Sequence, residues 1–265
     1  MFSDLTLSRR LERAEGSACR QFAAARRRLF PDCGSEWMEA AGACAVFDGV
    51  NSPVTQSFGL GIFEELSAES LDAFERFFQE RKAPVQHEVS PLAGVQALEV
   101  LCKRGYSPVE LSSVMYRAVA TVEQSGIAVR TVGPDEAAVW ANVSARGWSH
   151  EHPELREFLE QSMWLCTARD EAISFLAEID GVPGAAGSLC LHEGVALFGG
   201  ASTVPELRRR GLQAALMEAR MRYAKEHGCD LAMMVAEPGS NSQRNAERMG
   251  FRIAYTRTKW RLGED

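Results

Sequence analysis

TVPELRRRGLQA, residues 203–214, is the stretch of this sequence that decides the fold. A short apolar segment, residues 196–198, precedes it, and a long amphipathic pattern typical of a helix follows Gly211. Where a strand turns through a glycine into a helix, the first N–H groups of the helix have no partner inside it. The helix dipole favours negative charge at the same end. The stretch therefore predicts a binding site for a phosphate or pyrophosphate group.

Two other interpretations of this turn stay open. An ordinary strand-to-helix corner carrying three solvated arginines, Arg208 to Arg210, would give the same residues. A nucleotide-binding loop of the Walker type requires Lys and then Ser or Thr after the glycine, and this chain has Leu212 and Gln213 there. The turn thus favours an anion site of another kind.

Composition limits the class of protein. The chain has 265 residues, enough for two domains, and its net charge of −7 argues against a general binder of nucleic acid or of acidic membranes, which use a broad basic field. No apolar run approaches the about 18 residues of a membrane span, and the N-terminus lacks the apolar region of a signal peptide. Because the seven cysteines are scattered without a C-x-x-C pair, we expect no metal site, no disulfide framework and a cytoplasmic protein.

Hydrophobic periodicity predicts helices and strands in alternation. In the first half it predicts helices over 5–29, 67–81 and 94–104, and strands over 43–47, 55–63, 84–89 and 109–119. In the second half it predicts helices over 134–142, 150–161, 212–227 and 240–249, and strands over 127–132, 173–179, 185–192, 195–203, 231–236 and 251–262. The three strands from 173 to 203 are expected to be consecutive and antiparallel, because Asp180-Gly181 and Glu193-Gly194 separate them.

The two halves repeat one order of elements. A helix, a Gly-aromatic pair and a closing strand occur around Gly105-Tyr106 and again around Gly250-Phe251. An internal repeat predicts a duplicated fold, with domains at 1–122 and 123–265. The first half has Phe63-Glu64-Glu65 where a second arginine–glycine turn is expected, and its two carboxylates would repel a phosphate. Only the second half is therefore expected to hold an anion.

Roughly residues 127–262 resemble the GNAT superfamily of acyl-CoA N-acyltransferases. The residues that carry the resemblance are Val204-Pro205-Glu206, the run from Arg208 to Gln213, and Gly250-Phe251. Arg208 and Gly211 match the family signature R/Q-x-x-G-x-G/A, whereas Gln213 departs from it. The resemblance implies an α/β (α+β) fold of two GNAT-like domains, each a mixed, mostly antiparallel sheet flanked by helices, the first a degenerate copy without the cofactor signature.

The resemblance also implies a function. It points to an N-acetyltransferase that moves the acetyl group of its cosubstrate acetyl-CoA to a primary amine of a small molecule or peptide by direct attack. The alternative is a non-catalytic module that binds coenzyme A, and a homodimer is left open. The residues implied to bind the cofactor are Thr203, Val204, Arg208, Arg209, Arg210, Gly211, Leu212, Gln213, Ala214 and Asn245.

The chemistry suggests catalytic candidates. An amine with a pKa near ~10.4 must lose a proton before it attacks, and Glu237 after the strand at 231–236 is the candidate base, or else a surface-loop carboxylate. An N–H near Val204 is the expected donor to the thioester oxyanion. The family's general-acid tyrosine falls at Ala246, which leaves Ser242 as the polar candidate near the thiol, or else a first-turn helix residue. Trp148, between two early helices, is expected to be buried rather than to bind the acceptor.

Overall fold

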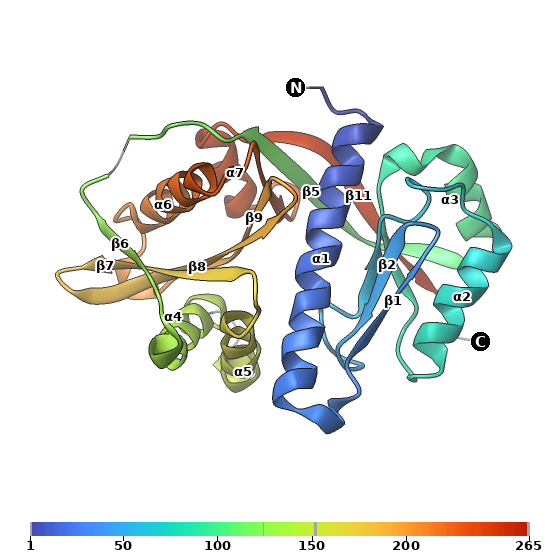
Figure 1. The fold of residues 1–265 in the computed structure, drawn as a ribbon, viewed down its shortest axis with the longest axis horizontal. Helices are drawn as coiled ribbons and strands as arrows, with labels where there is room; N and C mark the ends of the chain where they lie inside the picture. The colour runs from blue at the N-terminus through green and yellow to red at the C-terminus, as the bar shows by residue number, and fades with distance from the viewer. Residues whose placement is uncertain (1, 124, 151–152, 264–265) are drawn as a thin grey trace. The chain divides into compact units, whose positions relative to one another are not determined.

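The structure is a computed structural model that describes residues 2–123, 125–150 and 153–263. It contains two compact units. The first comprises the chain up to Tyr116, Val235–Glu247 and the chain from Phe251 onward, and the second comprises Arg117–Met234 and Arg248–Gly250. Both units contain helices and strands (Figure 1). No helix among the described residues is long and apolar enough to cross a membrane.

The first unit is a mixed sheet flanked by helices. Its strands follow the order β1-β2-β3-β4-β11-β5, in which β3 and β4 run parallel and the other neighbours antiparallel. The strands are β1 (Glu36–Ala40), β2 (Ala43–Phe47), β3 (Gln56–Phe58), β4 (Gln86–Val89), β5 (Tyr106–Ala118) and β11 (Arg252–Leu262). The helices are α1 (Leu5–Leu29), α2 (Ala68–Gln79), α3 (Gly94–Lys103) and α7 (Asn241–Arg248).

Strand β11 lies between β4 and β5. It pairs antiparallel with β4, where Lys259 faces Glu88, and with β5, where Thr256 faces Ser113. The residues that the sequence assigned to the closing strand of a second domain at 123–265 thus complete the sheet of the first unit. Period-2 alternation identifies a strand and its buried face, but it carries no information on which strand becomes its neighbour.

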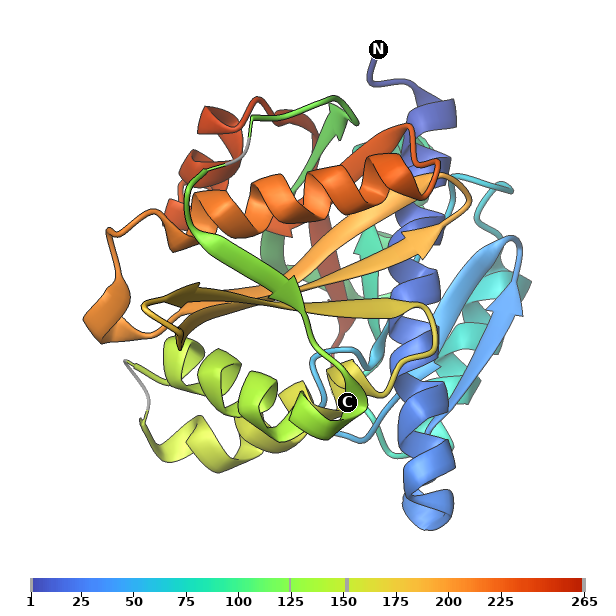
Figure 2. The ribbon, with the colours of Figure 1, turned by 60° about the vertical axis from the view of Figure 1, so that its left-hand side comes forward.

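The second unit is a sheet in the order β10-β9-β8-β7-β6, with β9 and β10 parallel and the other neighbours antiparallel. Its strands are β6 (Ala128–Thr131), β7 (Ala172–Ile179), β8 (Val182–His192), β9 (Val195–Thr203) and β10 (Leu231–Ala236). Helix α6 (Leu212–Glu226) covers one face of these strands, and α4 (Ala137–Trp148) and α5 (Arg156–Thr167) cover the other (Figure 2).

The predicted duplication is confirmed by the order of the elements. The series β1-β2-β3-α2-β4-α3-β5 recurs as β7-β8-β9-α6-β10-α7-β11, and in each series the strands on either side of the first helix run parallel. The two predicted hairpins are also confirmed, because Asp180-Gly181 and Glu193-Gly194 all have positive φ, as a type I′ turn requires. The chain is therefore an α/β protein, and the strands of each unit have mixed, mostly antiparallel pairing.

Some predicted bounds were wrong. The strand expected over 55–63 ends at Phe58, because Gly59 and Gly61 both take positive φ and the Phe63 ring folds back to 2.6 Å from where a side chain at Gly59 would begin. Strand β1 was missed, because its burial pattern is that of a half-exposed edge strand without clean alternation. Helix α1 begins and ends as predicted, with Asp4 as its N-cap.

A cluster of charged side chains is buried beneath α1. Arg257 of β11 donates to both carboxylate oxygens of Glu15 at 2.6 and 2.7 Å, and it lies 3.4 Å from Glu12 and 2.9 Å from Glu88. The Tyr255 hydroxyl, which is buried, donates to Glu12 at 2.8 Å. Burial is the main cause that raises the pKa of Glu12 to about 7, repulsion from Glu15 adds to it, and Arg257 opposes it.

A second buried chain of polar groups crosses the same unit. The Ser57 hydroxyl lies 2.6 Å from His87 Nδ1, and His87 Nε2 lies 2.9 Å from the Tyr106 hydroxyl. The Tyr106 hydroxyl donates to Glu75 at 3.2 Å. Burial lowers the pKa of His87 to about 3, so the imidazole is neutral at physiological pH.

Candidate functional site

Strand β9 leaves its parallel neighbour part-way along its length. The β9–β10 register runs from Val195↔Leu231 to Leu197↔Met233, and β9 then continues to Thr203. Just beyond Leu197 the antiparallel register with β8 also shifts, because Gly187 alone stands opposite Gly200 and Ala201. This is a β-bulge, and Gly200 takes positive φ in it. The far half of β9 therefore has a different environment from the half that pairs with β10.

The turn after β9 opens the N-terminus of α6. A 3-10 turn, Pro205–Leu207, follows the strand, then Arg209 and Gly211 take φ of 62° and 85°. Gly211 is the N-cap residue, and no side chain caps α6. The first N–H groups of this 15-residue helix are the donors that an anion requires. The backbone thus has the form of an anion site, as the sequence predicts.

Two side chains brace this turn from inside. Arg208 donates through Nε to the carbonyl of Thr203 at 3.3 Å and through Nη2 to the carbonyl of Gly147 in α4 at 3.1 Å. The Gln213 amide, which replaces the family's small residue, donates to the Thr203 hydroxyl at 2.8 Å. These bonds tie the end of β9 to the first turn of α6. The Arg208 guanidinium therefore donates to carbonyls of the protein itself and does not extend toward a phosphate.

Arg209 and Arg210 differ from Arg208. Both side chains are exposed, and within the described part of the chain neither makes a hydrogen bond or an ion pair. Guanidinium groups form strong charge-assisted hydrogen bonds with phosphates. Of the three arginines, these two are therefore the ones whose guanidinium groups are not already engaged in holding the turn.

The Val204 backbone is engaged in hydrogen bonds within the protein. Its N–H donates to the carbonyl of Gly184 in β8 at 2.9 Å, and its carbonyl accepts from the Leu207 N–H at 3.1 Å. The sequence predicts an N–H near Val204 as the donor to the thioester oxyanion. The Val204 N–H itself is used by β8, since the β8–β9 ladder extends one residue beyond Thr203.

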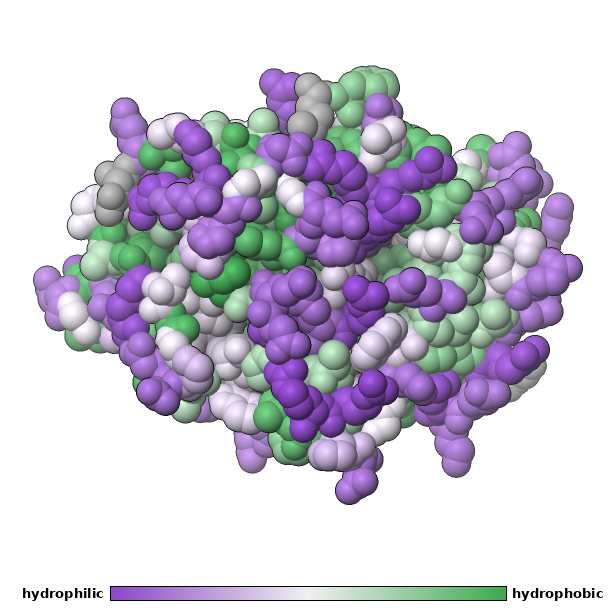
Figure 3. All heavy atoms as spheres, in the orientation of Figure 1, coloured by the Kyte–Doolittle hydropathy of each residue, from purple (hydrophilic) through white to green (hydrophobic). Residues whose placement is uncertain are grey.

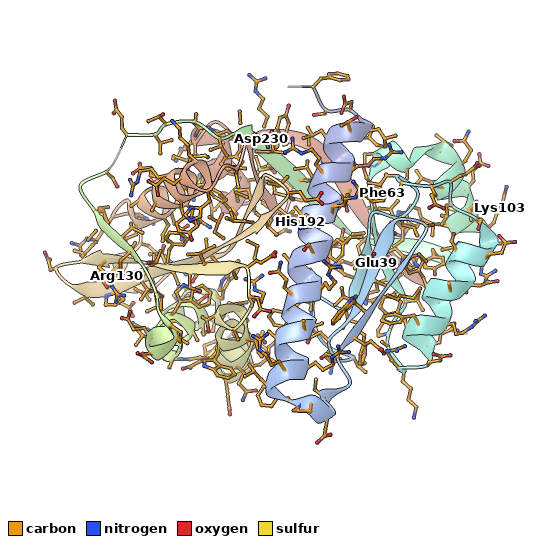
Figure 4. All side chains as sticks on the ribbon, in the orientation of Figure 1. Glu39, Phe63, Lys103, Arg130, His192 and Asp230 are labelled. Atoms are coloured by element: carbon orange, nitrogen blue, oxygen red, sulfur yellow. The ribbon has the colours of Figure 1, made fainter. Side chains whose placement is uncertain are left out.

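The corresponding turn of the first unit is closed. Helix α2 has Ser67 as N-cap, whose hydroxyl accepts from the Ser70 N–H at 3.2 Å, and the Ser70 hydroxyl lies 3.1 Å from the Ser67 N–H in return. Glu64 and Glu65 before it are exposed. Phe63, which lies beside α1 (Figure 4), stacks under the Arg13 guanidinium at 4.5 Å. This helix end has its own cap and adjacent negative charge, in contrast to α6.

The predicted catalytic residues belong to the other unit. Glu237 and Ser242 are exposed and Asn245 is half-buried, and all three lie in the segment Val235–Glu247 of the first unit, whereas the turn from Arg208 to Ala214 lies in the second. Ser240 is the N-cap of α7, since its hydroxyl accepts from the Gln243 N–H at 3.2 Å. Ala246 is wholly buried, so the position of the family's tyrosine holds a core methyl group.

Trp148 is 53% exposed, so the expectation that it would be buried was wrong. It ends α4, and hydrophobic residues interrupt the polar surface over this part of the molecule (Figure 3). The exposed apolar residues of α4, α5 and the turn before α5 are Val139, Trp148, Leu155, Phe158 and Trp164. His152, four residues after Trp148 in the sequence, lies outside the described residues. Sequence reasoning also missed Arg220 and Trp140, which contact the bulge and whose spacing resembles that of ordinary core positions.

Comparison with known proteins agrees with this geometry. Residues 137–251 match the sequence model described as the Acetyltransferase (GNAT) family. A GCN5-related N-acetyltransferase from Kribbella flavida is 16% identical, with 93% of this chain and 96% of that chain covered and a TM-score of 0.65. One from Sphaerobacter thermophilus is 20% identical, with 83% and 79% covered and a TM-score of 0.52. A search among curated proteins finds no matching sequence.

A third similar structure bears on the duplication. It is a tandem GNAT protein from the clavulanic acid biosynthesis pathway, 17% identical, with 84% of this chain and 76% of that chain covered and a TM-score of 0.53. At these identities the solved structures show a common fold. The match of residues 137–251 to the GNAT family model, together with the repeated elements before them, is consistent with a GNAT domain that follows an N-terminal second copy. Acyl transfer is the general chemistry of that family.

Proposed function

We propose that this protein is an N-acetyltransferase that transfers the acetyl group of acetyl-CoA to a primary amine of a small molecule or peptide by direct attack. The observation that carries the proposal is the uncapped N-terminus of α6 at Gly211, placed directly after a strand whose pairing with β10 ends at Leu197. The open N–H groups suit the pyrophosphate of coenzyme A. The part of β9 beyond Leu197 suits the pantetheine arm.

The residues divide into two roles in this proposal. The backbone from Arg209 to Ala214 cradles the pyrophosphate, and the exposed Arg209 and Arg210 add charge-assisted bonds. Gln213 and Arg208 hold the cradle in shape through Thr203. Within the described residues no group of three His, Cys, Asp or Glu side chains could hold a metal ion, and the proposed chemistry uses none. Placing the amine beside the thioester supplies much of the rate. Glu237 stays the candidate base, Ser242 the other catalytic candidate and Asn245 a candidate cofactor residue.

A charge placed inside the cradle tests the proposal. Gln213→Glu adds a carboxylate at the start of α6, where the helix dipole favours it, so the variant should fold. Gln213→Met loses the same bond to Thr203 without adding charge, and it is the matched control. Isothermal titration should show that the wild type and Gln213→Met bind acetyl-CoA and coenzyme A, with little binding of ATP. Gln213→Glu should bind both at least about tenfold more weakly, because placing its carboxylate beside the pyrophosphate costs several kcal/mol of binding free energy.

Measurement of catalytic activity distinguishes an acetyltransferase from a non-catalytic module that binds coenzyme A. Release of the coenzyme A thiol should accompany acetyl-CoA consumption with at least one primary amine of a broad panel. The buried Ala246 favours the second candidate, a non-catalytic module that binds coenzyme A, since the usual acid is missing. Binding without thiol release across the panel would support that module. Equal affinities of Gln213→Glu and Gln213→Met would refute the assignment of this turn.

A further inference from the structure

The bulge in β9 is held by a buried arginine of α6. Arg220 is 2% exposed, and its Nη1 donates to the carbonyls of Ser188 at 3.3 Å and Gly199 at 3.4 Å. Its Nε donates to the carbonyl of Leu216 in its own helix at 3.1 Å. Ser188 and Gly199 face each other across β8 and β9 as the last pair before the bulge. One guanidinium thus fastens both strands to α6 where their register shifts.

The charge of Arg220 is not neutralised by an acid. Among the described residues no carboxylate pairs with it, and the Phe198 ring lies 4.8 Å from its guanidinium carbon. Burying an unpaired cation costs several kcal/mol. A methionine or leucine at the same place in the core would avoid that cost. Burial of the Arg220 guanidinium at the bulge therefore lowers the stability of the fold, and packing alone does not explain why an arginine is there.

A glycine and a tryptophan complete the arrangement. A side chain at Gly187 would begin 3.3 Å from the guanidinium carbon of Arg220, so glycine leaves the room that the arginine uses. From the opposite face the buried Trp140 of α4 donates through Nε1 to the carbonyls of Phe175 at 3.0 Å and Gly187 at 3.3 Å. A bulge interrupts the ladder. Here side-chain donors on both faces of the sheet satisfy carbonyls beside it.

The orientation of one peptide links Arg220 to the proposed site. The carbonyls of Ser188 and Gly199 both point to Nη1, between β8 and β9. No described peptide bond is cis, and the C=O and N–H of a trans peptide point in opposite directions. The N–H of Gly200, which belongs to the same peptide as the Gly199 carbonyl, is therefore directed to the other edge of β9. That is the edge from which β10 has separated after Leu197.

We propose that Arg220 is a positioning residue of the acyl-transfer site, which fixes the bulge and polarises the Gly199–Gly200 peptide toward the thioester. The proposal rests on the proposed function. A cation bonded to a peptide oxygen draws electron density from the N–H of that peptide, and hydrogen bonds in a chain strengthen one another. The thioester carbonyl gains negative charge as the amine attacks, and a fixed donor is worth more to that charge than to the ground state.

Three variants test the proposal. Arg220→Met removes the charge and fills the volume, and it should retain or gain stability, as replacement of buried ions by apolar residues often does. Arg222→Met removes the same charge two residues further along α6 from a half-buried position, and it is the matched control. Gly187→Ala keeps the charge but presses on the guanidinium. Each is compared with the wild type in unfolding, in binding of coenzyme A and acetyl-CoA, and in steady-state kinetics.

The expected pattern is specific to the thioester. Arg220→Met and Gly187→Ala should lower kcat by about tenfold, less than the about 100-fold loss for a direct oxyanion donor, and should remove any preference for acetyl-CoA over free coenzyme A. The affinity for free coenzyme A should change little, because the cradle at Gly211 is untouched. Arg222→Met should behave as the wild type.

The outcomes separate this proposal from the proposed function. If the wild type binds no coenzyme A, the proposed function fails. If it binds and turns over, and Arg220→Met or Gly187→Ala keeps the wild-type kcat and preference for acetyl-CoA, the role of Arg220 is refuted. Should Arg220→Met not fold, Gly187→Ala alone decides, because alanine is compatible with a strand and leaves the arginine in place.

Discussion

Glu12 offers the sharpest test of the energetics of the first unit. Its carboxyl group is fully buried beneath α1, where it accepts from Tyr255 and lies near Arg257, Glu15 and Glu88. Burial raises its pKa from 4.5 to about 7. Each pKa unit corresponds to about 1.4 kcal/mol, so keeping Glu12 ionised in the folded protein costs about 3 kcal/mol.

The sign of the pH dependence follows from the raised pKa. Below pH 4.5 the carboxyl is protonated in both states and costs nothing. Between pH 4.5 and 7 the unfolded chain releases the proton while the folded protein retains it, so the contribution of Glu12 to stability falls as the pH rises. Above pH 7 the carboxyl is ionised in both states and the cost stays constant. Glu12→Gln has no such titration and keeps the oxygen that accepts from Tyr255.

We therefore expect the free energy of unfolding of Glu12→Gln, relative to that of the wild type, to increase by about 3 kcal/mol as the pH rises from 4.5 to 8. Urea unfolding at a series of pH values, followed by circular dichroism, measures this difference, and titrating groups that do not interact with Glu12 cancel between the two proteins. Glu15→Gln is the control, since it replaces one of the two oxygens that accept from Arg257 with an amide nitrogen and should lose stability throughout. A difference between wild type and Glu12→Gln that stays flat with pH would refute the reasoning.

Two further predictions rest on single contacts. Because burial lowers the pKa of His87 to about 3, the wild type should lose stability as the pH falls below 6.5. His87→Gln cannot take up a proton in acid, so its stability should fall less. The urea midpoints of both proteins at pH 4 to 7 measure the difference. Gly147→Ala would place a methyl carbon 2.4 Å from the Ser202 hydroxyl and 3.0 Å from the Thr203 nitrogen. It should therefore lower the free energy of unfolding by about 1–3 kcal/mol and weaken acetyl-CoA binding. Thermal unfolding with and without the ligand measures both effects. An unchanged melting temperature would contradict the close packing of α4 on β9.

Local signals made much of the fold predictable. Pro31 and the apolar spacing set the end of α1, the two hairpin turns carry residues that adopt positive φ, and the glycine of the arginine–glycine turn lies at the start of α6. Each of these depends on residues within a few positions of each other. The duplicated order of elements, visible in the two Gly-aromatic pairs, follows from the same local signals.

Features that depend on distant residues were not predictable. The position of β11 depends on which strands offer it unpaired edges, and alternation along β11 carries no trace of that. The Val204 N–H is used because β8 extends to meet it. Arg220 stands beside the apolar stripe of α6, where a long charged side chain ordinarily reaches solvent, and only the bulge of β9 supplies the carbonyls that hold it inside.

The position of β11 in the sheet determines the order in which the two units can complete folding during synthesis. Domains generally fold from the N-terminus as they emerge, yet the sheet of the first unit has β11 between β4 and β5, and the ribosome makes β11 only after all five strands of the second unit's sheet. Until then β4 and β5 present open edges, which invite pairing with other chains. The unit that is begun first is thus finished last, and nascent chains halted before Arg252 should be the species most prone to aggregate.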